Sequence, residues 1–105
     1  MTDEVLVLST ASSQEEAKKI ATALVERKLA ACVNIVPQLQ SVYRWKGKVE
    51  SAEEVLLLIK TVKAREKDLE SAIRELHSYE LPEFIVISIE RGSTEYLVWI
   101  EDSVG

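Results

Sequence analysis

The stretch ACVNIVPQLQSVYRWKGKVESAEEVLLLI, residues 31–59, decides the fold. It holds an extended strand that covers residues 31–36, is interrupted at Pro37 and resumes over residues 42–45, and a second extended segment from Val55 to Ile59. Gly47 supplies a turn between them, so the second segment is expected to return antiparallel to the first. Pro37 cannot donate to a strand ladder, which predicts an edge position, a bend or a bulge. The stretch therefore predicts a bent β-hairpin.

A strand and a helix are predicted before the hairpin. The apolar run Val5–Leu8 is typical of a central strand that is buried on both faces. Ser13 and Glu16 form a capping box, and apolar residues at helical spacing follow them. This pattern predicts a helix that ends near Lys28.

A helix, a strand and a last short helix are predicted after the hairpin. Apolar residues at helical spacing between Ala64 and His77, with Pro82 beyond, indicate the helix. Phe84–Ile89 reads as the fourth strand. Gly92 and the polar residues after it lead into the last helix.

The order of elements is β-α-β-β-α-β with an extra C-terminal helix. Right-handed crossovers place both main helices on one face of an antiparallel four-stranded sheet, which is the ferredoxin-like split βαβ fold of the α+β class. We expect residues 1–105 to form a single domain, because 105 residues leave no room for a second core. Only the last helix is left to cover the other face of the sheet, so partner subunits are expected there.

Composition and motifs narrow the function classes. Eighteen acidic and thirteen scattered basic residues give a net charge of -5, which argues against nucleic acid as a partner. No apolar run approaches the roughly 20 residues needed to span a bilayer, so we expect no membrane association. A lone cysteine and an N-terminus without a basic region favour a cytoplasmic protein. The three glycines do not have the spacing of a nucleotide-binding loop, and no motif of a hydrolytic triad accompanies the single histidine. We therefore expect neither an organic cofactor nor an enzyme.

Cys32 and His77 are the two soft metal ligands of the chain. Cys32 lies in an apolar strand, where free cysteine usually behaves as a small buried hydrophobe. His77 ends a helix in a segment that reads as too polar for the core, and there a capping role and a ligand role are equally supported. A metal site would have to draw ligands from neighbouring subunits or be weak.

The aromatic residues suggest an interface or a cleft. Tyr43 and Trp45 share one face of their strand by the period of two, as expected for interface anchors. A ligand cleft lined by these rings is the alternative. Glu50, Glu53 and Glu54 follow the hairpin tip and are interpreted as solvated residues without a role.

Five separated motifs together resemble the CutA divalent-ion tolerance proteins over essentially the whole chain. In order they are residues 30–37 (AACVNIVP), Ser41-x-Tyr43-x-Trp45-x-Gly47-x-x-Glu50, Leu57-x-Ile59-Lys60-Thr61, His77-x-Tyr79-Glu80-x-Pro82-Glu83 and Tyr96-Leu97-x-Trp99. The resemblance implies a homotrimer similar in architecture to the PII signalling proteins, with edge strands joined around a threefold axis. It also implies tolerance of copper and other divalent metal ions.

The same resemblance implies site residues. The proposed metal site involves Cys32 and His77, and the intersubunit cleft would be lined by Tyr43, Trp45, Lys60, His77, Tyr79, Glu80 and Trp99. Two positions depart from the family pattern. Ser78 replaces the usual proline after the histidine, which is expected to loosen a rigid turn. Ser9 replaces a second cysteine of some relatives, so weak rather than tight copper binding is expected.

Three functional hypotheses follow. The first is a trimeric protein that binds copper or another divalent metal ion and serves in the response to metal ions. The second is a PII-like signalling module that binds a small metabolite in the intersubunit cleft, although the short turn at Gly47 leaves little to act as a signalling loop. The third is a structural trimer that anchors a partner protein.

Overall fold

A four-stranded antiparallel sheet forms the centre of the computed structural model, which describes residues 2–105. Its strands are β1 (Glu4–Ala11), β2 (Cys32–Trp45), β3 (Lys48–Val62) and β4 (Ile85–Ser88). They lie in the order β2-β3-β1-β4, so that β1 is internal and β2 and β4 are the edges. Strand order and pairing confirm the predicted ferredoxin-like split βαβ fold.

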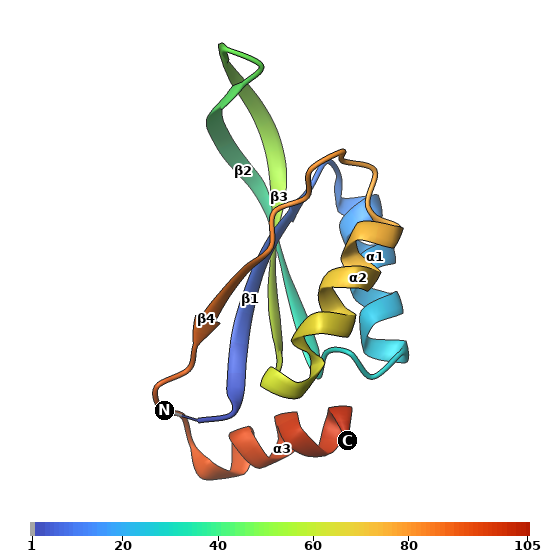
Figure 1. Cartoon of the computed structure of the whole chain (residues 1–105), viewed down its shortest axis with the longest axis vertical. Coiled ribbons are helices and arrows are strands. Elements are labelled where there is room, and N and C mark those ends of the chain that lie inside the picture. The colour runs from blue at the N-terminus through green and yellow to red at the C-terminus, as the bar shows by residue number, and fades with distance from the viewer. Residues whose placement is uncertain (1) are drawn as a thin grey trace.

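Two helices, α1 (Gln14–Glu26) and α2 (Glu66–Leu76), cover one face of the sheet, and α3 (Thr94–Val104) lies across one end (Figure 1). A single turn of 3-10 helix, Lys63–Arg65, leads from β3 into α2. Alternate residues of β1 and β3 point towards α1 and α2 because side chains alternate along a strand. The largest buried members of this core include Val7, Leu24, Leu57, Ile59, Leu69 and Ile73.

The start of α1 is capped as predicted, with one difference. The Ser13 hydroxyl accepts a hydrogen bond from the Glu16 amide at 3.1 Å, as a helix N-cap does. The Glu16 carboxylate, however, bonds to the amide and hydroxyl of Ser12. The helix ends at Glu26, two residues before the expected end, because Lys28 has a φ of 58° and leaves the helical region.

The β2–β3 hairpin is longer than the sequence predicted and projects beyond the rest of the molecule (Figure 1). Lys46 and Gly47 both have positive φ at its tip, as in a type I′ turn. Val36 pairs with Leu56 and the next pair is Leu39 with Glu54, so β2 carries one extra residue at the predicted position beside Pro37. One extra residue reverses which side chains of β2 face each side of the sheet.

The second face of the sheet is apolar and only partly covered. α3 packs Ile100 and Val104 against Ala31 and Val62 at one end of it. The rest of this face and the β4 edge leave Val36, Ile85 and Ile87 between 40% and 49% exposed. This is the face that was expected to need cover from partner subunits.

Candidate functional site

A cavity of about 790 Å³ lies between the outer half of the hairpin and the segment from Ser78 to Ile85 that leads into β4. Tyr43 and Trp45 reach it from β2 because the bulge turns them onto the sheet face that carries Glu54. The remaining lining residues are Thr10, Ser12, Ala52, Glu53, Ser78, Tyr79, Glu80, Leu81, Pro82, Glu83, Phe84 and Ile85. The lining therefore combines aromatic rings with four glutamates and holds no lysine or arginine.

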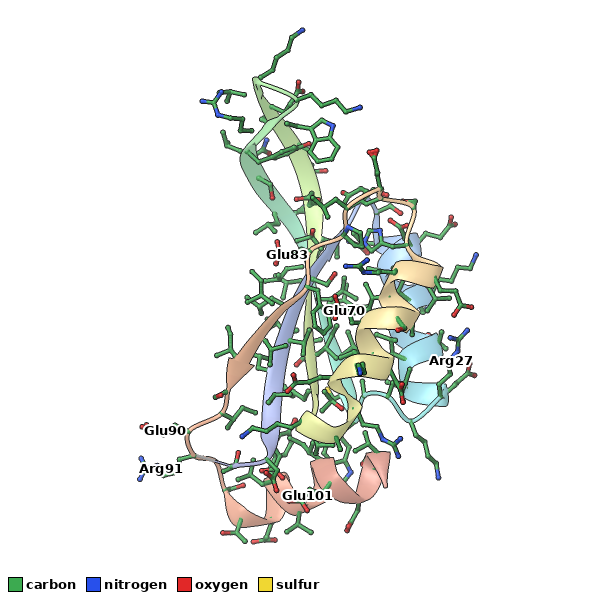
Figure 2. The ribbon with its side chains drawn as sticks, viewed as in Figure 1. Arg27, Glu70, Glu83, Glu90, Arg91 and Glu101 are labelled. Carbon is green, nitrogen blue, oxygen red and sulfur yellow. The ribbon has the colours of Figure 1, made fainter. Side chains whose placement is uncertain are left out.

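A short hydrogen bond joins Tyr79 and Glu54 in this cavity. The Tyr79 hydroxyl donates to the Glu54 carboxylate over 2.6 Å, a length typical of a bond to a charged acceptor. Burial and the neighbouring Glu54 raise the pKa of the Tyr79 hydroxyl. Burial and the Glu54 charge also raise the pKa of Glu83, which stands where the chain enters β4 (Figure 2). The cavity thus has a negative potential that disfavours further negative charge.

The side chain of His77 is fully buried, so the interpretation of its segment as too polar for the core is wrong for this side chain. The Nδ1 atom accepts a hydrogen bond from the Tyr79 amide at 3.1 Å. The Nε2 atom lies 2.6 Å from the Thr10 carbonyl and must be the donor, because a carbonyl only accepts. The ring is therefore the neutral Nε2-H tautomer, and both nitrogen atoms have partners.

Glu16 holds the turn after His77. Its carboxylate accepts from the Ser78 amide at 2.9 Å and lies 3.8 Å from His77 Nδ1. Burial would raise the pKa of Glu16, but the hydrogen bonds from Ser78 and Ser12 outweigh it and lower the pKa to about 2. A proline at position 78 has no amide hydrogen and could not form this bond. The turn that was expected to be loosened by Ser78 is therefore fixed by a charged hydrogen bond.

Cys32 and His77 do not meet within one chain. Cys32 is half-buried at the start of β2 and pairs with Lys60, which pairs in turn with Leu6 of β1. His77 contacts Thr10, four residues further along β1, so sheet spacings place Cys32 and Thr10 about 16 Å apart. Among residues 2–105, no three His, Cys, Asp or Glu side chains gather as a metal site.

The predicted cleft residues fall into two groups within one chain. Tyr43, Trp45, Tyr79 and Glu80 line the cavity together. Lys60 and Trp99 do not line it and instead flank Tyr96 of α3. The Lys60 ammonium donates to the Tyr96 hydroxyl at 3.2 Å, and the rings of Tyr96 and Trp99 are 5.4 Å apart. Tyr96 was not among the predicted cleft residues.

Glu53 and Glu54 are two charged cavity residues that the sequence reasoning dismissed. Both were interpreted as solvated, but Glu54 binds Tyr79 and both line the cavity. A signal was present in the alternation of β3, since Glu54 precedes Leu56 on the same face of that strand. It could not be used without knowing how far the hairpin extends.

The sequence model of the CutA1 divalent ion tolerance proteins matches residues 5–103. The chain belongs to this CutA1 family. A Thermus thermophilus relative named divalent-cation tolerance protein CutA is 47% identical over 102 residues, which are 97% of this chain and 99% of that protein. A solved structure of the Thermus thermophilus protein covers the same shares and superimposes with a TM-score of 0.95.

Other CutA1 family members differ in length and in the compartment that their names give. The chain spans 51% to 63% of the length of several animal and plant relatives. One of them, from Arabidopsis thaliana, is 44% identical over 94% of this chain and is named chloroplastic. A solved Archaeoglobus fulgidus structure is described as periplasmic; it is 41% identical, covers 97% of this chain and 99% of that chain, and has a TM-score of 0.94.

No helix within residues 2–105 is both long enough and apolar enough to cross a bilayer.

Proposed function

We propose that this CutA1 family member acts as a homotrimer that binds divalent metal ions weakly and serves in tolerance of them, without catalysing a reaction. The observation that supports the assembly is the apolar sheet face that α1 and α2 do not cover. Ile85, Ile87 and Val36 are each about half exposed, and burying the rest of such a side chain is worth about 1 kcal/mol.

The two free edges of the sheet support a ring. The long, bulged edge β2 and the short edge β4 differ in length and sequence, so pairing between them joins unlike surfaces. Head-to-tail contacts of this kind close into a ring when the rotation allows it. The homotrimer that the family resemblance implies favours a ring of three copies.

Cys32 is the better supported metal ligand of the two candidates. It lies on edge strand β2, where a neighbouring copy can add ligands to its thiolate. His77 would have to give up its bond to Thr10 or to Tyr79 before it could bind a metal. We therefore propose a weak site for copper, zinc or a similar ion at Cys32, with His77 as a ligand only after that rearrangement.

Variants on the two faces test the assembly. Native mass spectrometry of the metal-free protein should give a trimer, and Ile85→Glu should give a monomer because it charges the uncovered face. Val25→Glu is the matched control, since Val25 is 42% exposed on α1, and it should remain a trimer. A monomeric wild-type protein, or a trimeric Ile85→Glu variant, would contradict the proposed assembly.

Metal titration tests the site. Zinc, which has no redox chemistry with a thiol, is added first and copper second, and three ions per trimer are expected. Cys32→Ser should lose both ions and remain trimeric. The control Asn34→Ser lies two residues along the same face of β2 and should keep them. Unchanged uptake in Cys32→Ser would refute Cys32 as a ligand.

The cavity supports a second candidate function, the binding of a small metabolite. Its volume of about 790 Å³ suits a small organic ligand, and its four glutamates favour one with a positive charge. Choline and 2-oxoglutarate titrations of Trp99→Phe, in which Trp45 is the remaining fluorophore, test this candidate. Quenching by choline alone is expected, and quenching by 2-oxoglutarate alone would refute the charge argument.

We also propose a cytoplasmic location and a protein partner. The lone cysteine supports a reducing, cytoplasmic compartment. Val42 and Val49, about 70% exposed on the hairpin, support the hypothesis of a protein partner.

A further inference from the structure

Three aromatic side chains from two segments line the cavity beside the hairpin. Tyr43 and Trp45 come from β2, and Tyr79 comes from the segment on the opposite side of the cavity. The side chains of Tyr43 and Trp45 belong to residues that are 44% and 37% exposed, so one chain leaves their rings largely uncovered. Large exposed rings that share a cavity are typical of a surface that binds a ligand.

Tyr79 is held in place at both ends. Its amide donates to His77 Nδ1 at 3.1 Å, and its hydroxyl donates to Glu54 at 2.6 Å. The centres of the Tyr79 and His77 rings are 4.6 Å apart. The bond to Glu54 joins the segment after His77 to the hairpin, so it fixes the Tyr79 ring across the cavity from Tyr43. A ring that is fixed before a ligand arrives loses little freedom on binding.

The cavity and its rings both favour a cation. Four glutamates line the cavity, and among residues 2–105 no lysine or arginine does so. The face of an aromatic ring attracts positive charge by itself, and the Lys46 ammonium already lies 5.8 Å from the centre of the Trp45 ring. The rings therefore indicate a cation independently of the glutamates.

The rest of the lining indicates which kind of cation fits. A primary ammonium needs acceptors for its three N–H groups, but Glu54, which bridges the two sides of the cavity, already accepts from Tyr79. A quaternary ammonium carries methyl groups in their place, needs no acceptor and is bound by aromatic faces. The remaining apolar lining residues are Ala52, Leu81, Pro82, Phe84 and Ile85.

We propose that Tyr43, Trp45 and Tyr79 bind the quaternary ammonium group of a small metabolite in this cavity. The assignment rests on the second candidate function, the binding of a positively charged metabolite, and names the chemical group that is bound. The glutamates attract the cation, and the three rings select methyl groups over N–H groups.

Three related ligands test this selection. Choline carries a trimethylammonium group, ethanolamine carries a primary ammonium group, and the neutral carbon analogue of choline carries a tert-butyl group in the same place. Each is titrated into the full-length wild-type protein at constant ionic strength, and the indole N–H resonance of Trp45, assigned with Trp99→Phe, is followed by NMR. Choline should bind about tenfold more tightly than the neutral analogue and about fivefold more tightly than ethanolamine.

The affinities separate the selection from the second candidate function. Equal binding of choline and the neutral analogue would overturn the proposal, because the cavity would then bind apolar shape and not charge. Tighter binding of ethanolamine than of choline would overturn the proposal but leave the second candidate function supported, since a cation is still bound. Absence of binding by all three ligands at millimolar concentration would overturn both.

Variants of Tyr43 test the aromatic ring itself. Tyr43→Leu keeps an apolar side chain without a ring and should weaken choline binding about two- to fivefold. Tyr43→Phe keeps the ring and should bind choline more tightly than Tyr43→Leu does. Position 43 is 44% exposed on the hairpin, so both variants should fold, which their unfolding midpoints check. Equal choline affinities of the two variants would overturn the proposal.

A methylated lysine of a protein carries the same quaternary group. Acetyl-trimethyllysine amide presents this group on a peptide backbone, and it should bind no more tightly than choline because the proposed contacts reach only the ammonium group. Tighter binding of this compound would overturn the assignment to a small metabolite.

Discussion

The charged hydrogen bonds of Glu16 can be measured as a pH-dependent stability. Its pKa falls from 4.5 to about 2, which corresponds to about 3 kcal/mol at 1.36 kcal/mol per unit. The side chain is 15% exposed, so solvent screening reduces the expected contribution to about 1–2 kcal/mol. Because the folded-state pKa is lowered, this stabilisation is complete well above pH 4.5 and is lost as the pH falls towards 2.

Glu16→Gln should therefore lower the free energy of unfolding by about 1–2 kcal/mol at pH 7, and the difference should shrink progressively at pH 4 and pH 2.5. Guanidinium unfolding at one fixed chain concentration measures it, since assembly couples stability to concentration. Glu15→Gln, an exposed neighbour in the same helical turn, is the control and should lose about 0.5 kcal/mol. A Glu16→Gln difference that is the same at all three pH values would refute the reasoning.

Three further substitutions probe other contacts. Thr61→Val should lower the free energy of unfolding in urea by about 1–2 kcal/mol, because the buried hydroxyl donates to the Leu29 carbonyl at 2.7 Å. Thr61→Ser keeps the hydroxyl and should retain most of this stability, so equal losses in the two variants would contradict the contribution of the hydrogen bond. Tyr79→Phe should lower the free energy of unfolding by about 1 kcal/mol, because it removes the hydroxyl that donates to Glu54. The midpoint of thermal unfolding should fall, and an unchanged midpoint would contradict this contribution. Gly47→Ala should destabilise the hairpin tip by about 1 kcal/mol, because an alanine is strained at the φ of 81° found there. Amide hydrogen exchange at the tip should become faster, and unchanged exchange would contradict this prediction.

Local patterns in the sequence predicted the elements of this fold. The capping box at Ser13 and the helical spacing after it placed α1 to within two residues of its end. Pro37 predicted an edge position, a bend or a bulge, because it has no amide hydrogen to donate to a ladder, and β2 is an edge strand with a bulge at this point. Motifs spread along the chain identified the CutA1 family, which the match over residues 5–103 confirms.

The sequence by itself thus determined the order of the elements, because helical and strand periodicity depends on spacing between near neighbours. The number of helices indicated the lack of cover on one sheet face, and motifs spread along the chain indicated the family. Only the tertiary structure decided the environments of single side chains. It buried the His77 side chain between Thr10 and Tyr79 and separated it from Cys32. These contacts join residues many positions apart, and their geometry follows from strand register and helix docking, which no local spacing encodes.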